Sequence, residues 1–170
     1  MPTNVRSNPA TSVASSPWVA ATVAALAALA AVAFVFVHSS EGQAAPATGP
    51  VVSTAQSSLG RILVNSRGHT LYLFERDRRG RSACSGQCAK FWPPLIAAGQ
   101  PRAAAGARAS LLGRTRRADG RMQVTYNRHP LYAFVKDSRR GQTRGEELDA
   151  FGGEWYAISP AGAKVEKDDS

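Results

Sequence analysis

The chain carries the same eighteen-residue pattern twice, sixty residues apart. Gly60–Asp77 aligns with Gly120–Asp137 without a gap, and eight of the eighteen positions are identical: Gly, Arg, Val, His, Leu, Tyr, Phe and Asp. A duplicated supersecondary unit usually packs against its own copy, because a single unit cannot bury its apolar face alone. The repeat therefore predicts one domain made of two related halves.

Each copy is expected to form a β-hairpin. Met122–Tyr126 alternates apolar and polar residues, which is the period of a half-buried strand. Asn127-Arg128 supplies turn residues, and Leu131–Val135 is a second run of aromatic and aliphatic residues. Pro130 has no N–H group to donate, so it fits only at the first residue of that return strand.

A Tyr-x-Phe-x-x-Asp motif occupies each return strand. The period of two places the Tyr and the Phe on one face of the sheet, where both copies would contribute to a shared core. The Asp falls where the strand should end, and its carboxylate can accept backbone N–H groups and close the next turn. A ligand site lined by Tyr and Asp is the alternative. The motif residues are Tyr72, Phe74 and Asp77, followed by Tyr132, Phe134 and Asp137.

The similarity continues beyond the motif. A basic loop follows each Asp, at Arg78–Gly80 and at Ser138–Gly141. Further on, Trp92–Gly99 resembles Trp155–Gly162 at a shift of sixty-three residues. The second of these segments predicts a short closing strand that is anchored by a buried Trp.

Together these features resemble the bacterial family of secreted repeats of unknown function, which are predicted lipoproteins with a repeated Tyr-x-aromatic-x-x-Asp motif. Besides the motif, the resemblance rests on Cys-x-x-x-Cys before Trp92-Pro-Pro and on Gln123-Val-Thr-Tyr before Pro130-Leu-Tyr, and it covers about residues 58–160. It implies a secreted or surface-anchored domain and brings no activity with it. No cysteine ends the N-terminal apolar run, so the resemblance gives no lipid-attachment site there.

The N-terminal apolar run has the length of a membrane span. Trp18–Val37 comprises twenty residues, of which only Thr22 is polar. As a helix it would extend about 30 Å, the thickness of a bilayer's hydrocarbon core. That length favours an uncleaved signal-anchor, because the apolar region of a cleaved signal peptide has roughly 7–15 residues. The small residues at Gly42–Ala45 keep cleavage, and with it a secreted protein, as the alternative.

Charge asymmetry gives the expected orientation. Arg6 is the only basic residue before the apolar run, and none occurs from His38 through Gly60. This bias favours a cytoplasmic N-terminus and an extracytoplasmic main domain at the cell membrane.

The predicted fold class is mainly β, with two hairpin-plus-strand units in one small domain after an N-terminal transmembrane or signal helix. The repeats would occupy about residues 58–99 and 110–162. The expected segments are a cytoplasmic tail (1–17), the helix (18–37), a flexible linker (38–57), the β domain (58–162) and a charged tail (163–170).

Cys84 and Cys88 occur only in the first copy. In an oxidising compartment, two cysteines four residues apart most simply form a disulfide. The alternative is a metal or thiol-redox site. His69 and His129 occupy equivalent positions and would complete a two-Cys, two-His set that suits copper or zinc. The disulfide is preferred, and no cofactor is expected.

The net charge of +9, with seventeen arginines, indicates anionic partners. A positive surface concentrates anions, so anionic lipid headgroups and wall polymers are the candidates, beside the membrane that the N-terminal helix would enter. No recognition helix or zinc-finger pattern accompanies the charge, which argues against nucleic acid.

The sequence also lacks the residue patterns of common active sites. It contains no Gly-x-Ser-x-Gly, no His-Glu-x-x-His and no phosphate-binding glycine loop. We therefore expect a non-catalytic, membrane-anchored, extracytoplasmic binding or envelope-associated module rather than an enzyme. The alternative function is that of a metal-binding or thiol-redox accessory protein.

Overall fold

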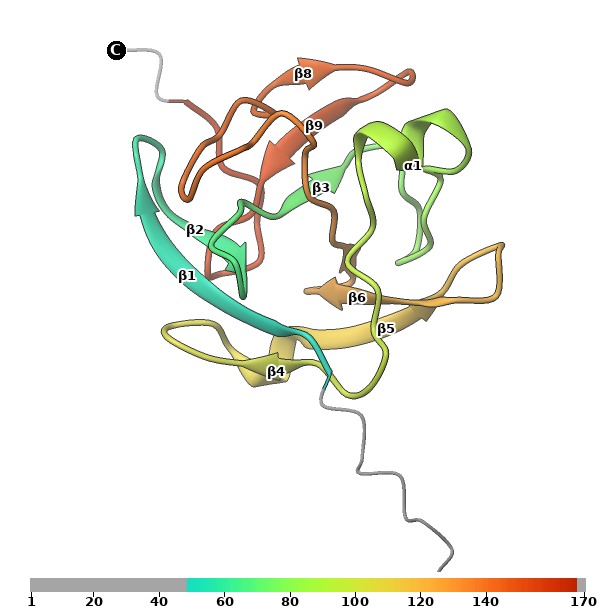
Figure 1. Cartoon of the computed structure of the whole chain (residues 1–170), viewed down its shortest axis with the longest axis horizontal. Coiled ribbons are helices and arrows are strands. Elements are labelled where there is room, and N and C mark those ends of the chain that lie inside the picture. Colours follow the sequence, from blue (N-terminus) through green and yellow to red (C-terminus); the bar gives the residue numbers. More distant parts are fainter. Residues whose placement is uncertain (1–48, 168–170) are drawn as a thin grey trace, which may run out of the picture. The chain divides into compact units, whose positions relative to one another are not determined.

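Each of the three small sheets contains a tight hairpin. The computed structural model describes residues 49–167, which are mainly β and contain one short α-helix, α1 (Gln87–Phe91), and one 3-10 turn (Ala109–Leu111) (Figure 1). In the first sheet, β1 (Val51–Ser57) pairs antiparallel with β2 (Gly60–Asn65) and parallel with β4 (Arg102–Ala103).

The second sheet contains a tight hairpin with its turn at Asp119-Gly120. It joins β5 (Leu112–Arg116), β6 (Met122–Tyr126) and β7 (His129–Pro130) in that order. Gly120 takes the left-handed backbone conformation, with φ of +82°. Asp119 Oδ1 accepts the N–H of Arg121 at 3.1 Å, so the carboxylate closes the turn as an Asx residue does.

The third sheet joins the two repeats. β3 (Tyr72–Phe74) pairs antiparallel with β9 (Glu154–Ala157), which also pairs with β8 (Leu148–Asp149). β3 comes from the first repeat, whereas β8 and β9 come from the second. Tyr72 and Tyr132 also exchange backbone hydrogen bonds at 2.8 and 3.0 Å, so the two motifs meet directly.

The equivalent pairing occurs in the other half of the molecule. Val135 N–H donates to Phe91 O at 3.1 Å, as Glu75 N–H donates to Glu154 O at 3.0 Å. Ala133 N–H donates to the oxygen of Pro93, one residue after Trp92, at 2.9 Å. Each motif strand therefore runs beside the Trp segment of the other repeat.

Both predicted hairpins are present, but their strands pair over a shorter stretch than predicted. The return strand of the first copy meets β2 in a single bridge, Val64↔Thr70, and that of the second copy forms only two rungs with β6. The strands then diverge because their aromatic side chains pack on the opposite repeat. The repeats do form one domain of mainly β structure, as the sequence predicts.

The gapless alignment is also offset by one residue before the turn. Leu63 N–H donates to Ile158 O at 2.7 Å, and the corresponding bond runs from Val124 N–H to Leu95 O at 2.8 Å. Leu63 is therefore the structural counterpart of Val124, whereas the gapless alignment pairs Val124 with Val64. The turn of the first copy is one residue longer than that of the second. Because of this extra residue, the two motifs after the turns are again sixty residues apart.

A stack of four aromatic rings forms the centre of the domain. Phe74 stacks on Trp155, Trp155 on Trp92, and Trp92 on Phe134, with ring centroids 4.0, 3.9 and 4.2 Å apart. Trp92 and Trp155 are nearly parallel, at 3°. Each outer ring belongs to the repeat opposite to that of the Trp it covers.

The two motif tyrosines complete this core. Tyr72 packs edge-on against Trp92 at 5.3 Å, and Tyr132 packs edge-on against Trp155 at 5.1 Å. All four predicted motif aromatics belong to the cluster, as expected. The other face of the motif strands lies on a second cluster, which includes Leu71, Leu73 and Leu131.

Both boundaries of the domain lie further out than predicted. Val51–Ser57 is β1 and not part of a flexible linker, because it pairs with β2 and all of its residues except Gln56 are buried or half-buried. At the other end, Val165 N–H donates to Ala157 O at 2.9 Å, so the start of the charged tail packs on the domain. Every described strand has its partner within residues 49–167, so this segment contains a complete core.

The predicted cytoplasmic tail (1–17), helix (18–37) and first part of the linker (38–48) lie outside the described residues. Within residues 49–167, no helix is long and apolar enough to cross a bilayer.

The exchanged strands predict that neither half folds alone. Residues 49–105 and 106–167, separated in the exposed loop near Ala105, should each lack tertiary structure because β3 and β9 are then on different fragments. Mixing them should restore the fold. Near-ultraviolet circular dichroism of the Trp stack measures this, with the uncut segment as the reference. A fragment that folds by itself would contradict the exchanged pairing.

Candidate functional site

The two motifs exchange their tyrosine–aspartate hydrogen bonds. Tyr72 Oη donates to Asp137 Oδ2 at 2.6 Å, and Tyr132 Oη donates to Asp77 Oδ2 at 2.8 Å. Each motif thus supplies the donor for one bond and the acceptor for the other. Sequence reasoning treated each motif by itself and missed this exchange, although the duplication was the signal that pointed to it.

The second oxygen of each carboxylate closes a loop of its own repeat. Asp77 Oδ1 accepts the N–H of Ala83 at 2.7 Å, and Asp137 Oδ1 accepts the N–H of Arg144 at 3.0 Å. Each aspartate therefore lies three residues after its motif phenylalanine, where it holds the following loop and also the tyrosine of the other motif.

Burial determines the protonation of these groups. It raises the pKa of Asp77 to about 6, against the hydrogen bonds from Ala83 and Tyr132 that favour the carboxylate. Burial raises the pKa of Asp137 as well. The pKa values of Tyr72 and Tyr132 are raised, first by burial and then by their carboxylate partners. Both phenols therefore stay protonated and act as hydrogen-bond donors.

A buried arginine holds the loop that follows the first motif. Arg117 is 6% exposed, and its guanidinium donates to Gln123 Oε1 at 2.6 Å, to Cys84 O at 2.7 Å and to Ser82 Oγ at 2.8 Å. Ser82 Oγ also lies 2.8 Å from Tyr132 Oη. This network connects the loop to the exchanged Tyr–Asp pair and fixes its backbone.

The predicted disulfide is confirmed. Cys84 and Cys88 are bonded, with their Cα atoms 5.3 Å apart, and both are buried in the aromatic cluster. They flank the start of α1, so the bond fixes the segment that leads into Trp92.

The alternative two-Cys, two-His metal set is not assembled. The cysteines are disulfide-bonded. No three His, Cys, Asp or Glu side chains among residues 49–167 are grouped to hold a metal ion. His129 lies beside a pocket that Asp77 and Arg78 also line, and burial lowers its pKa. His69 instead follows the turn that is closed by Asn65.

The second repeat contains a buried carboxylate at Glu146. Its Oε2 accepts the N–H of Ala157 at 2.7 Å, whereas its Oε1 is buried without a partner. Burial raises the pKa of Glu146 to about 7. Sequence reasoning missed this group, because Glu146 stands in a polar stretch that is typical of exposed loops.

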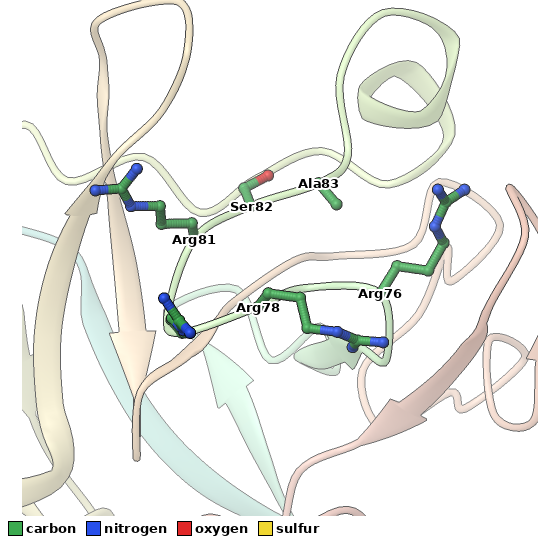
Figure 2. Close-up of a pocket in the computed structure, with 6 residues that line it drawn as sticks. Arg76, Arg78, Arg81, Ser82 and Ala83 are labelled. Atoms are coloured by element: carbon green, nitrogen blue, oxygen red, sulfur yellow. The ribbon is translucent and has the colours of Figure 1, made fainter.

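An arginine pocket lies at the basic loop that follows the first motif. It has a volume of about 800 Å³ and is lined by Arg76, Arg78, Arg79, Arg81, Ser82 and Ala83. Arg76 and Arg81 lie at its two ends, and Ser82 and Ala83 lie along one side (Figure 2). The sequence identified this basic loop, but the pocket depends on the fold of the turn.

A two-residue turn presents these arginines. Arg78 and Arg81 exchange backbone hydrogen bonds at 3.2 and 2.9 Å, and Arg79 and Gly80 between them have φ of +52° and +75°. This geometry corresponds to a type I′ turn, in which Asn-Gly is the preferred pair. Arg79 therefore occupies a backbone position that local conformational preference does not favour.

The pocket arginines are available for a ligand. Arg76 donates to Phe151 O at 2.9 Å, and Arg78 donates to Glu75 O. Within the described part of the chain, none of the four arginines forms a salt bridge with a carboxylate. Guanidinium groups bind phosphate and carboxylate groups through paired N–H donors. The arrangement is thus suited to anions.

The exchanged hydrogen bonds predict energetic coupling across the repeats. Tyr72→Phe should cost about 1–3 kcal/mol of unfolding free energy, because it leaves Asp137 Oδ2 buried without its donor. Combined with Asp137→Asn it should be strongly non-additive. The matched control is Tyr72→Phe with Asp77→Asn, within one motif, which should be nearly additive. Urea unfolding measures both cycles. Coupling within the motif and none across the repeats would contradict the exchange.

Glu146 predicts stability that falls as pH rises. The folded protein keeps this proton up to pH about 7, whereas the unfolded chain releases it near pH 4.5. Over that range the folded state binds more protons, so unfolding becomes easier as pH increases. Glu146→Gln should flatten the part of this slope that lies above pH about 6, the pKa of Asp77, and stabilise the domain at pH 8 by on the order of 1–3 kcal/mol. Thermal melts from pH 4 to 8 test it, and an unchanged slope would contradict it.

The comparison with protein families agrees with the division into two halves. The family model described as secreted repeat of unknown function matches residues 53–96 and 113–159, one match in each repeat. The comparisons with curated proteins and with solved structures found no match. The family description indicates a location outside the cytoplasm. Because the two matches together cover more than half of the chain, the protein belongs to the family of secreted repeats of unknown function.

Proposed function

We propose that this protein is a non-catalytic extracytoplasmic module that binds an anionic component of the cell envelope through its arginine pocket. In this proposal the apolar run Trp18–Val37 anchors the module in the membrane. The observation that carries the proposal is a pocket lined by four arginines, none of which forms a salt bridge within residues 49–167.

The backbone at the turn supports a binding role for Arg79. A non-glycine residue in the left-handed region costs roughly 1–2 kcal/mol. Asn would fit the turn better, and an exposed Arg adds no packing that offsets this cost. Residues in strained positions concentrate at functional sites. The position of Arg79 is therefore better explained by a ligand than by folding.

Hydrogen bonds and the disulfide hold the side of the pocket that Ser82 and Ala83 form. Arg117 binds Ser82 and the carbonyl of Cys84, and the disulfide fixes the next turn of chain. The Asp77 carboxylate accepts the backbone N–H of Ala83. An arginine set on a fixed backbone loses less conformational freedom when it binds, so the pocket is organised before the ligand arrives.

The chemistry favours a ligand with repeated or exposed phosphate or carboxylate groups. Several guanidinium groups on one surface attract polyanions over long distances, and the attraction weakens with salt. Phospholipid headgroups and anionic wall polymers share this chemistry and are both present outside the cytoplasmic membrane.

Replacing Arg79 provides a test in which stability and binding separate. In residues 49–167, Arg79→Asn should keep or raise the melting temperature, because Asn-Gly suits the turn. It should weaken binding to a soluble glycerol-phosphate polymer about fivefold. Adding Arg81→Gln should weaken binding further. Isothermal titration calorimetry at low and high salt measures the affinity.

The matched control is Arg102→Asn on β4, which removes the same charge from an exposed strand that does not line the pocket. Equal losses for Arg79→Asn and Arg102→Asn would show a general charge effect and reject the pocket. The absence of binding to both the polymer and anionic vesicles would reject the proposed function.

A further inference from the structure

Three exposed apolar residues form one patch beside the arginine pocket. Phe91, Val135 and Phe151 are 45%, 49% and 40% exposed. The rings of Phe91 and Phe151 are 6.0 Å apart, and Val135 is joined to Phe91 by a backbone hydrogen bond. Figure 1 shows the end of the β8–β9 hairpin next to α1. We call these three residues the Phe patch.

The internal repeat shows that the fold does not require this patch. The counterparts of Phe91 and Val135 in the other half are Glu154 and Glu75, which are joined by the same backbone hydrogen bond. Both counterparts are charged and solvated, and Glu75 pairs with Lys164 at 3.1 Å. The same pair of backbone positions thus accepts two carboxylates in the other half. The apolar side chains of Phe91 and Val135 are therefore not required for folding and need a different explanation.

Phe151 occupies a strained position at the tip of a turn. Ala150 N–H donates to Gly153 O at 3.0 Å, and Phe151 and Gly152 between them have φ of +61° and +80°. Asn-Gly is again the preferred pair for such a turn, and a bulky residue with positive φ is rare. An exposed aromatic ring held there at a cost indicates a partner outside the domain.

Basic residues border the patch. Lys90 and Lys136 are exposed and adjacent in sequence to Phe91 and Val135. Arg76 binds the carbonyl oxygen of Phe151 and also lines the arginine pocket. Among residues 49–167, none of these three cations forms a salt bridge.

Two carboxylates lie on the same hairpin, and one of them is engaged. Glu154 accepts a hydrogen bond from Tyr156 Oη at 2.7 Å, whereas Asp149 is exposed on β8. The border of the Phe patch is therefore basic on balance. Aromatic rings beside Lys and Arg are the composition of surfaces that enter the headgroup region of anionic bilayers.

We propose that the Phe patch docks the domain onto an anionic lipid bilayer. Phe91 and Phe151 enter the headgroup region, and Arg76, Lys90 and Lys136 contact the lipid phosphates. This inference rests on the proposed function. It identifies lipid headgroups as the anionic ligand, because a docked domain would bring the adjacent arginine pocket to the same headgroups.

The test uses residues 49–167, so that the apolar run Trp18–Val37 cannot itself enter the vesicles. Co-sedimentation with phosphatidylglycerol–phosphatidylcholine vesicles is compared for the unchanged segment and Phe151→Asn. Phe151→Asn should keep or raise the melting temperature, because it relieves the strained turn, yet weaken vesicle binding about tenfold. A second variant, Phe91→Glu with Val135→Glu, copies the other half and should also remain folded while it loses vesicle binding.

The remaining measurements separate this inference from the proposed function. Phe151→Asn should leave binding to the soluble glycerol-phosphate polymer unchanged, whereas Arg79→Asn weakens binding to both ligands. Unchanged vesicle binding by Phe151→Asn would overturn the docking surface and leave the arginine pocket standing. If Phe151→Asn weakened binding to the polymer and to the vesicles equally, the docking surface would also be overturned, because the substitution would then act through the arginine pocket.

A second copy of the chain is the other partner that could cover the Phe patch, and the experiment must distinguish it from a bilayer. Sedimentation velocity without vesicles should show a monomer for all variants. A dimer that Phe151→Asn dissociates would assign the Phe patch to a second copy of the chain and overturn membrane docking.

Discussion

The fold depends on the contact between Trp92 and Trp155 at the centre of the domain. Each indole is covered on its other face by the motif phenylalanine of the opposite repeat. Offset and edge-on aromatic contacts add about 0.5–1.5 kcal/mol each beyond the area that they bury. The strands, loops and Tyr–Asp pairs are arranged so that these four rings can stack, because neither repeat alone provides both covers for its Trp.

The duplicated motif carried most of the information about the fold that could be obtained from sequence. Identity at Tyr72/Tyr132 and Phe74/Phe134, together with the period of two, led to a shared aromatic core. The partner of each strand was not predictable in the same way. Hairpin formation is a local signal, whereas pairing of β3 with β9 depends on which surface covers the Trp. The strand Val51–Ser57 was missed because its small polar residues resemble a linker.

The candidate site was less accessible to sequence reasoning than the core. The basic loop was visible in the sequence as a run of arginines. The disulfide was predictable from two cysteines four residues apart. The pocket itself arises from the turn at Arg79-Gly80 and from the buried Arg117 behind it. Arg117 stands among exposed arginines in a strand end, and only its depth in the fold distinguishes it from them. Glu146 and the Phe patch were hidden for the same reason, since burial and neighbours decide their roles.

The exchange between repeats also bears on how the two halves can differ. Two identical copies related by a two-fold axis would make every one of the exchanged bonds, which is the geometry of a closed homodimer. The connection between residues 97 and 107, which includes β4, turns that assembly into a single chain, whose formation no longer depends on protein concentration. Once joined, the two halves are free from the requirement of identical sequence. One end of the domain, to which both repeats contribute, could then acquire the disulfide, the buried arginine and the apolar surface, while Glu75 and Glu154 occupy the equivalent positions at the other end.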